Sequence, residues 1–243
     1  MYAFIYGNVA YISLDANDVS NEISANRGYS EDAQTVWLSK RLRFLRQQPD
    51  IDFVVVYFHH CAYSTTNQHA SEGGVRSAWV PLFDRYKVDL VINGHNHVYE
   101  RSDALRGNVI KKSVPIGTTV SPATDGTVYV TAGGAGRSLY SFPVPDTYEG
   151  NEHPHIEVPS YYWDADGNKV TETIGWSRVR YTGYSFLAVD VEPAHAGRTT
   201  TLTVRAVAEN GSEIDRFTLK RTAAQVNQTA RGVGTAVPDL TAS

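Results

Sequence analysis

Two apolar runs, separated by a segment of helical periodicity, constrain the fold of this 243-residue chain more than any other feature. Residues 52–58 and 87–92 are rich in β-branched and aromatic side chains and are typical of strands covered on both faces. Between them, residues 75–86 carry four apolar side chains at helical spacing, Val75, Trp79, Leu82 and Tyr86. This order predicts a βαβ unit with parallel strands and a right-handed crossover.

Histidines follow both predicted strands. His59 and His60 come directly after the first strand, and His95 and His97 lie on the turn after the second. Because parallel strands end at the same edge of a sheet, we expect His59 to emerge close to the His95/His97 pair. Imidazole is a suitable ligand for divalent and trivalent cations, so this edge is a candidate metal site. The alternative for a His-x-His motif taken alone is a polar surface loop.

The segments on either side of this unit are predicted from their patterns. Residues 2–14 indicate a hairpin or two strands at a sheet edge, and residues 15–28 indicate a polar loop. A helix is expected from Ser30, with its basic residues on a solvated face, Lys40, Arg41, Arg43 and Arg46. Residues 127–132 predict a short strand. The glycine cluster that follows favours a tight turn, and the alternative is a phosphate-binding loop.

The C-terminal half is expected to be mainly β. Residues 142–174 have no consistent period and predict an ordered insertion or lid, whose His153 and His155 are expected in a surface loop. Alternation of apolar and polar residues then predicts an antiparallel meander over 184–191, 199–207 and 213–220. We therefore expect one domain over residues 1–220 and a loose tail over 221–243.

Composition limits the function classes. With 42% hydrophobic and 20% charged residues the chain is typical of a folded domain, and no run approaches the ~18 apolar residues of a membrane helix. A net charge of -4 argues against a nucleic-acid partner. The N-terminus is not recognisable as a signal peptide, and the single cysteine, Cys61, is compatible with an intracellular and a secreted protein. Localisation and oligomeric state therefore stay open.

One group of motifs, at about residues 30 to 102, carries a family resemblance. It contains Trp37-Leu38, the strand ending in Phe58-His59-His60, Tyr63-Ser64, His69 with Glu72-Gly73, and Gly94-His95-Asn96-His97-Val98-Tyr99-Glu100-Arg101-Ser102. These residues resemble the C-terminal half of the catalytic domain of purple acid phosphatases, in the calcineurin-like metallophosphoesterase superfamily. The resemblance implies an α/β fold, namely part of a calcineurin-like β-sandwich flanked by helices.

The resemblance also implies the roles of four histidines. His59 and His95 would bind one metal ion, His97 would bind a second, and His69 would lie near the leaving group of a small phosphoester substrate. In the family the two ions are iron with zinc, manganese or iron. Family position favours His59 over His60 as the ligand, and adjacent strand residues point to opposite faces, so His60 is expected to pack beside the site. Cys61 is expected to be a buried bystander, and Glu100 and Arg101 to form an ion pair or brace the histidine turn.

The carboxylate motifs of the family's N-terminal half are absent from the sequence, which contains no Gly-Asp dipeptide. We therefore expect a fragment or an internal start, which alone would hold one metal ion or none and be weakly active or inactive. Phosphate monoester hydrolysis is thus predicted for the family and for the complete protein, and weak or no activity for this chain alone. The alternatives are a non-catalytic metal- or phosphate-binding module and a structural remnant of the same fold.

Overall fold

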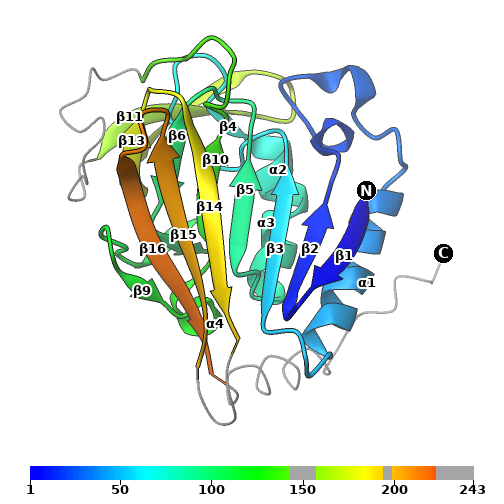
Figure 1. Cartoon of the computed structure of the whole chain (residues 1–243). Coiled ribbons are helices and arrows are strands. Elements are labelled where there is room, and N and C mark those ends of the chain that lie inside the picture. The colour runs from blue at the N-terminus through cyan, green and yellow to red at the C-terminus, as the bar shows by residue number, and fades with distance from the viewer. Residues whose placement is uncertain (143–156, 194–198, 223–243) are drawn as a thin grey trace.

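The computed structural model describes residues 1–142, 157–193 and 199–222. Helices lie behind a seven-stranded sheet, and a four-stranded sheet lies in front of it (Figure 1). One apolar core fills the space between the helices and the large sheet, and a second core fills the space between the two sheets. The expected β-sandwich flanked by helices is therefore confirmed.

The large sheet combines parallel and antiparallel strands in the order β1-β2-β3-β5-β10-β6-β13. The first two strands form the predicted hairpin, and β2, β3, β5 and β10 run parallel. The predicted βαβ unit is confirmed, because α2 (Gly73–Ala78) and α3 (Val80–Arg85) connect β3 to the parallel neighbouring strand β5. The strands are β1 (Tyr2–Tyr6), β2 (Val9–Ser13), β3 (Phe53–Phe58), β5 (Leu90–Asn93), β6 (Tyr99–Ser102), β10 (Val128–Ala132) and β13 (Ser177–Tyr181).

Helices cover one face of this sheet. Three of them contribute to the first core, α1 (Ala33–Arg46), α2 (Gly73–Ala78) and α3 (Val80–Arg85), while α4 (Pro122–Asp125) is a single turn. Leu38, Leu42 and Leu45 of α1 are buried, as their helical spacing predicts. The expectation of a solvated basic face was wrong for Arg46, which is 3% exposed and donates to Asp89 at 2.5 Å. A buried carboxylate stabilises the cation there.

The second sheet is the predicted meander. Its strands are β14 (Ser185–Glu192), β15 (Thr200–Ala208) and β16 (Glu213–Arg221), with β9 (Thr119–Val120) added in parallel to β16. Alternate residues of β15 are buried against the large sheet, as expected for a strand with one wet face. The meander thus shields the front of β5 and β10 and leaves their carboxyl ends free to carry a site.

Residues 158–174 form regular structure that the sequence did not predict. There β11 (Val158–Trp163) and β12 (Lys169–Ile174) make an antiparallel hairpin, and β11 also pairs in parallel with β4 (Ser71–Glu72). His153 and His155 lie outside the described residues. The remaining short elements are β7 (Ala104–Arg106), β8 (Val109–Lys112) and the 3-10 turns η1 (Ala16–Asp18) and η2 (Ser24–Asn26). Among the described helices, none has the length and apolar character needed to cross a bilayer.

Candidate metal centre

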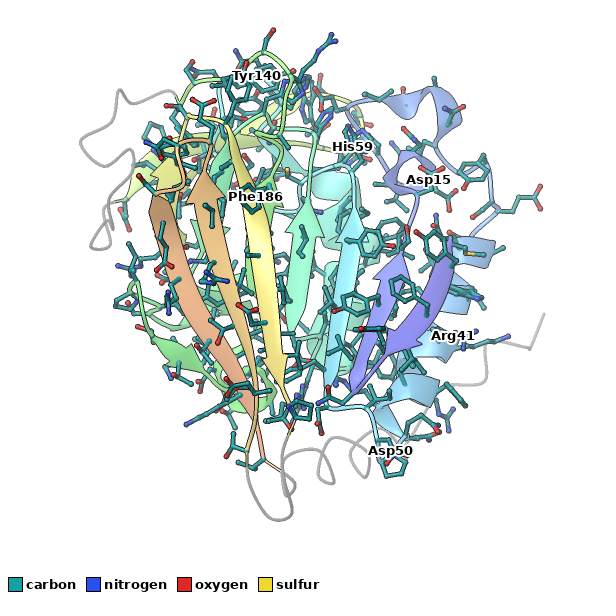
Figure 2. The ribbon with its side chains drawn as sticks, in the orientation of Figure 1. Asp15, Arg41, Asp50, His59, Tyr140 and Phe186 are labelled. Atoms are coloured by element: carbon teal, nitrogen blue, oxygen red, sulfur yellow. The ribbon has the colours of Figure 1, made fainter. Side chains whose placement is uncertain are left out.

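The predicted site residues lie at the carboxyl ends of the parallel strands. Figure 2 shows His59 at this end of the sheet, with Asp15 from the loop after β2 and Tyr140 from the loop after β10 at the same end. Three loops therefore converge here because three parallel strands end at this edge.

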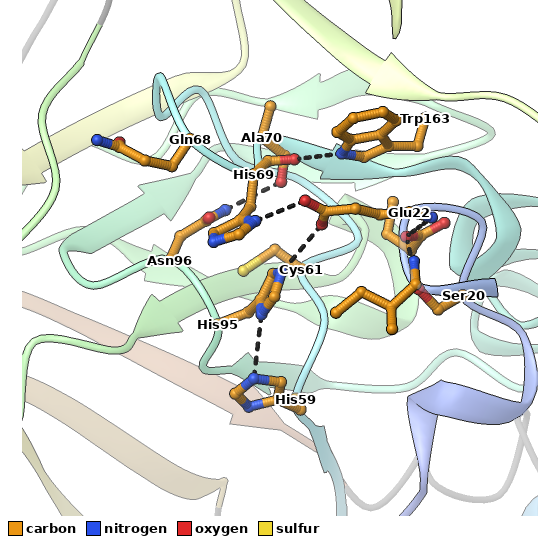
Figure 3. Close-up of polar contacts among 12 residues, drawn as sticks. Ser20, Glu22, His59, Cys61, Gln68, His69, Ala70, His95, Asn96 and Trp163 are labelled. Atoms are coloured by element: carbon orange, nitrogen blue, oxygen red, sulfur yellow. Dashed lines mark hydrogen bonds and ion pairs between the residues drawn. The ribbon is translucent and has the colours of Figure 1, made fainter. Parts of the chain in front are cut away.

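His59 and His95 are in direct contact. His59 Nε2 and His95 Nδ1 are 3.0 Å apart (Figure 3). The turn that carries His95 is fixed to the end of β3, because Gly94 donates from its amide to the carbonyl of His59 at 3.0 Å. His95 has a φ of 54°, a left-handed conformation that is uncommon for a residue other than glycine. The backbone at this turn is therefore set by its surroundings.

His97 faces a different neighbour. Its Nδ1 lies 2.7 Å from the carbonyl oxygen of Ser138 and therefore carries the ring proton, which leaves the lone pair on Nε2 for another partner. The ring stacks on Tyr140 with centroids 4.1 Å apart. A glycine makes this arrangement fit, because a Cβ on Gly133 would lie 2.1 Å from the carbonyl oxygen of Asn96. The glycine cluster after β10 thus packs against the histidine turn.

His69 lies beside His95, with ring centroids 4.0 Å apart. Its Nε2 is 3.3 Å from the hydroxyl oxygen of Tyr140, and its Nδ1 is 2.5 Å from a carboxylate oxygen of Glu22. The indole of Trp163 donates to the carbonyl of His69 at 2.9 Å, so the backbone is held as well as the ring. The structure therefore places the residue expected near a leaving group within the same cluster.

Glu22 is the residue that the sequence analysis missed. It lies in a loop predicted only to be polar, yet its second carboxylate oxygen accepts from His95 Nε2 at 2.9 Å (Figure 3). Burial alone would raise the pKa of Glu22, but hydrogen bonds from His95 and His69 outweigh it and lower the pKa. Among the described residues, one group of three potential ligands has its donor atoms within 4.8 Å of one another: Glu22, His69 and His95.

Burial keeps the side chains around His59 uncharged. Burial and the neighbouring imidazole of His95 lower the pKa of His59, so its ring is neutral and keeps a lone pair. His60 is 1% exposed and neither of its ring nitrogens has a hydrogen-bond partner, and burial lowers its pKa to about 4. Burial raises the pKa of Cys61 to about 12, so this residue is a thiol at neutral pH.

Glu100 and Arg101 brace the site through different partners. Both form structural ion pairs, Arg101 with Asp215 at 2.5 Å and Glu100 with Arg180 at 3.7 Å, because adjacent strand residues face opposite sides of the sheet. Glu100 also accepts from the hydroxyl of Ser64 at 2.9 Å and the amide of Thr65 at 2.8 Å. It therefore anchors the start of the loop that leads to His69.

Comparison with known proteins shows which family this chain resembles. Residues 3–99 match the family model of the calcineurin-like phosphoesterases. An uncharacterized protein of Mycobacterium tuberculosis is 37% identical over 245 residues, which cover 90% of this chain and 45% of that protein. Purple acid phosphatase 1 of Ipomoea batatas is 31% identical over 110 residues, which cover 43% of this chain and 22% of that protein.

A solved structure shows the same fold. The purple acid phosphatase PPD1 from yellow lupin seeds superposes with a TM-score of 0.65 at 20% identity, covering 100% of this chain and 36% of that one. The chain is therefore similar to the calcineurin-like phosphoesterases in sequence, and among them to the purple acid phosphatases, whose fold it shares. It spans about 45% of the length of the mycobacterial relatives that it matches.

Proposed function

We propose that this chain carries the histidine half of a metal centre that hydrolyses phosphate monoesters. Phosphoester hydrolysis with bound metal is the activity of the family. The observation that carries the proposal is the 3.0 Å contact between His59 and His95, which brings the ends of β3 and β5 together. Around one zinc-type cation two ligand nitrogens lie roughly 3.3 Å apart, so this pair suits a common ion.

The donor set fits the ions that the family binds. His59 and His95 would hold one ion and His97 the second. Partners on His95 Nε2 and His97 Nδ1 can fix the tautomers of these two rings. Buried His60, with two unpartnered nitrogens, lies 4.5 Å from the His95 ring and adds a polar group to the same region. When bound, such ions polarise phosphoryl oxygens and supply a hydroxide nucleophile.

His69 is proposed to act on the leaving group. Its ring proton on Nδ1 is donated to Glu22, so the tautomer and ring orientation are fixed. Its Nε2 faces the Tyr140 hydroxyl, which is the side on which a substrate oxygen would exchange protons with the ring. The chain thus contributes an oriented imidazole as well as metal ligands.

Hydrolysis of p-nitrophenyl phosphate tests the proposal. We would measure turnover and metal content for this chain and for a version of the protein as long as its mycobacterial relatives. We expect turnover in the longer protein and weak or no turnover in this chain, because a two-metal site requires carboxylates in addition to the histidines. His59→Ala and His95→Ala should abolish it in the longer protein, whereas His153→Ala should not.

Failure of the longer protein to turn over the substrate would contradict the proposal. A longer protein that binds metal without hydrolysing any monoester would instead favour a metal-binding module. Turnover that survives His95→Ala would show that this histidine does not belong to the centre.

A further inference from the structure

We propose that Glu22, His69 and His95 form a binding site for one divalent cation of the zinc type on this chain. The site differs from the ligand set proposed above, because it uses a carboxylate of the chain itself and needs neither His59 nor His97 as ligands. The inference therefore does not rest on the proposed hydrolysis. The two ligand sets share His95, so variants of the other residues tell them apart.

The donor chemistry is that of a zinc site. Two imidazoles and one glutamate are a common set for an ion that keeps a further position open. His69 Nδ1 and His95 Nε2 lie 2.5 and 2.9 Å from different oxygens of the Glu22 carboxylate (Figure 3). All the donor atoms point to one small region, so a cation could bind His69 Nδ1, His95 Nε2 and the carboxylate once each ring proton has moved to the other nitrogen of its ring.

In that tautomer the other nitrogen of each ring carries the proton and has a partner for it. His95 Nδ1 faces His59 Nε2 at 3.0 Å, and His69 Nε2 faces the Tyr140 hydroxyl at 3.3 Å. Such hydrogen bonds on the outer nitrogen orient metal-bound histidines and raise their basicity. Both rings are therefore prepared to bind a metal through the nitrogen that now contacts Glu22.

The loop that carries Glu22 is anchored by a second, buried glutamate. Glu72 is 2% exposed, and its carboxylate accepts from the amide of Asn21 at 2.6 Å, the amide of Glu22 at 3.1 Å and the hydroxyl of Ser20 at 3.1 Å. The loop backbone is thus fixed at Glu22 and at the residue before it. Its side chain contacts the two histidines through both carboxylate oxygens.

Two glycines allow this anchoring. A Cβ on Gly74 would lie 1.7 Å from the carbonyl oxygen of Val19, and one on Gly73 would lie 2.1 Å from the carbonyl oxygen of Trp163. The start of α2 therefore lies directly against the loop and against β11. A preorganised carboxylate loses less conformational entropy when it binds, which favours metal affinity.

Exposure and charge also suit a bound cation. The side chains of His69, Glu22 and His95 are 27%, 12% and 10% exposed, so the group is sheltered but open on the His69 side. With neutral rings its formal charge is that of one carboxylate, which a divalent ion would more than balance. No lysine or arginine pairs with Glu22 among the ion pairs of the described residues.

Cobalt(II) titration of the purified chain tests the site. Tetrahedral cobalt absorbs in the visible range, so both stoichiometry and ligand geometry are read directly. We expect one ion per chain, and binding about tenfold weaker or worse in Glu22→Gln and His69→Gln. Glu209→Gln is the matched control, because it alters an exposed glutamate in the turn after β15, and its affinity should stay within about twofold.

The inference fails if the chain binds no cobalt. It also fails if His97→Gln loses binding while Glu22→Gln retains it, which is the result expected for the family ligand set. Far-UV circular dichroism of each metal-free variant shows whether it folds. If Glu22→Gln does not fold, the affinity of His69→Gln decides the test. Because binding is measured on this chain, the result is independent of whether the longer protein hydrolyses phosphate esters.

Discussion

The carboxylate of Glu72 accepts a hydrogen bond from the backbone amide of Glu22 at 3.1 Å, although fifty residues separate them. One glutamate is buried and structural, and the other projects from the same loop toward His69 and His95. The first therefore sets the position of the second. Because the anchor contacts neither histidine, its role can be separated from metal binding by measuring stability.

Glu72→Ala should lower the free energy of unfolding by about 3 kcal/mol. The substitution removes a buried acceptor and leaves the amides of Asn21, Glu22 and Gly74 without their partner. Urea denaturation measures the loss. Glu192→Ala, on the exposed face of β14, is the control and should change stability by about 0.5 kcal/mol or less. Equal stability of both variants would show that the loop does not depend on Glu72.

Gly74→Ala should destabilise the chain by about 3 kcal/mol. The added methyl group would meet the carbonyl oxygen of Val19 at 1.7 Å, and that backbone cannot move without disturbing the Glu22 loop. Gly175→Ala is the matched control, because the nearest atom to its Cβ would be 3.9 Å away. Thermal unfolding of the two variants gives the comparison. A Gly74→Ala protein as stable as Gly175→Ala would contradict the close packing of α2 on the loop.

The hydrophobic pattern of the sequence was enough to predict the strands and the helical segment that hold the site. The apolar runs and the helical segment between them predicted two parallel strands, and parallel strands end at one edge. The proximity of His59 and His95 follows from that rule, whereas their direct contact also depends on the turn at Gly94 and His95. Strand alternation likewise predicted the meander, because its outer face is wet.

Contacts between distant segments could not be predicted in this way. Glu22 lies in a loop without periodicity, and its position depends on Glu72. The available signal was topological, since β2 runs parallel to β3 and its following loop must reach the same edge. Burial of Arg46 likewise depends on Asp89, whereas helix patterning alone suggested exposure. The β11–β12 hairpin was missed because its residues do not alternate clearly in hydrophobicity.

Asp89→Asn should cost about 3–5 kcal/mol of stability. The carboxylate is fully buried and accepts from Arg46 at 2.5 Å and from Arg221 at 2.6 Å, so Asp89→Asn removes the negative charge that two buried guanidiniums share. Chemical denaturation at neutral pH measures the effect. Asp190→Asn is the control, because Asp190 is 63% exposed where it pairs with Arg205, and it should cost less than about 1 kcal/mol. A small effect at Asp89 would mean that water reaches this group.

Cys61 should be unreactive in the folded chain. Burial raises the pKa of its thiol to about 12, and the residue is 1% exposed beneath the histidine turn, where its sulfur donates to the carbonyl of Gly94 at 3.1 Å. A disulfide reagent requires an accessible thiolate, whereas Cys61 is a buried thiol at pH 8. We expect no reaction with 5,5′-dithiobis(2-nitrobenzoate) until denaturant is added.

Full reaction in guanidinium provides the internal control, because the sequence contains one cysteine and the absorbance reports on that residue alone. The labelling rate at low denaturant then measures how often the end of β3 opens, since reaction requires Cys61 to separate from Gly94. Rapid labelling of the native chain would show instead that the turn carrying His95 is open, and the contact between His59 and His95 would then not persist in solution.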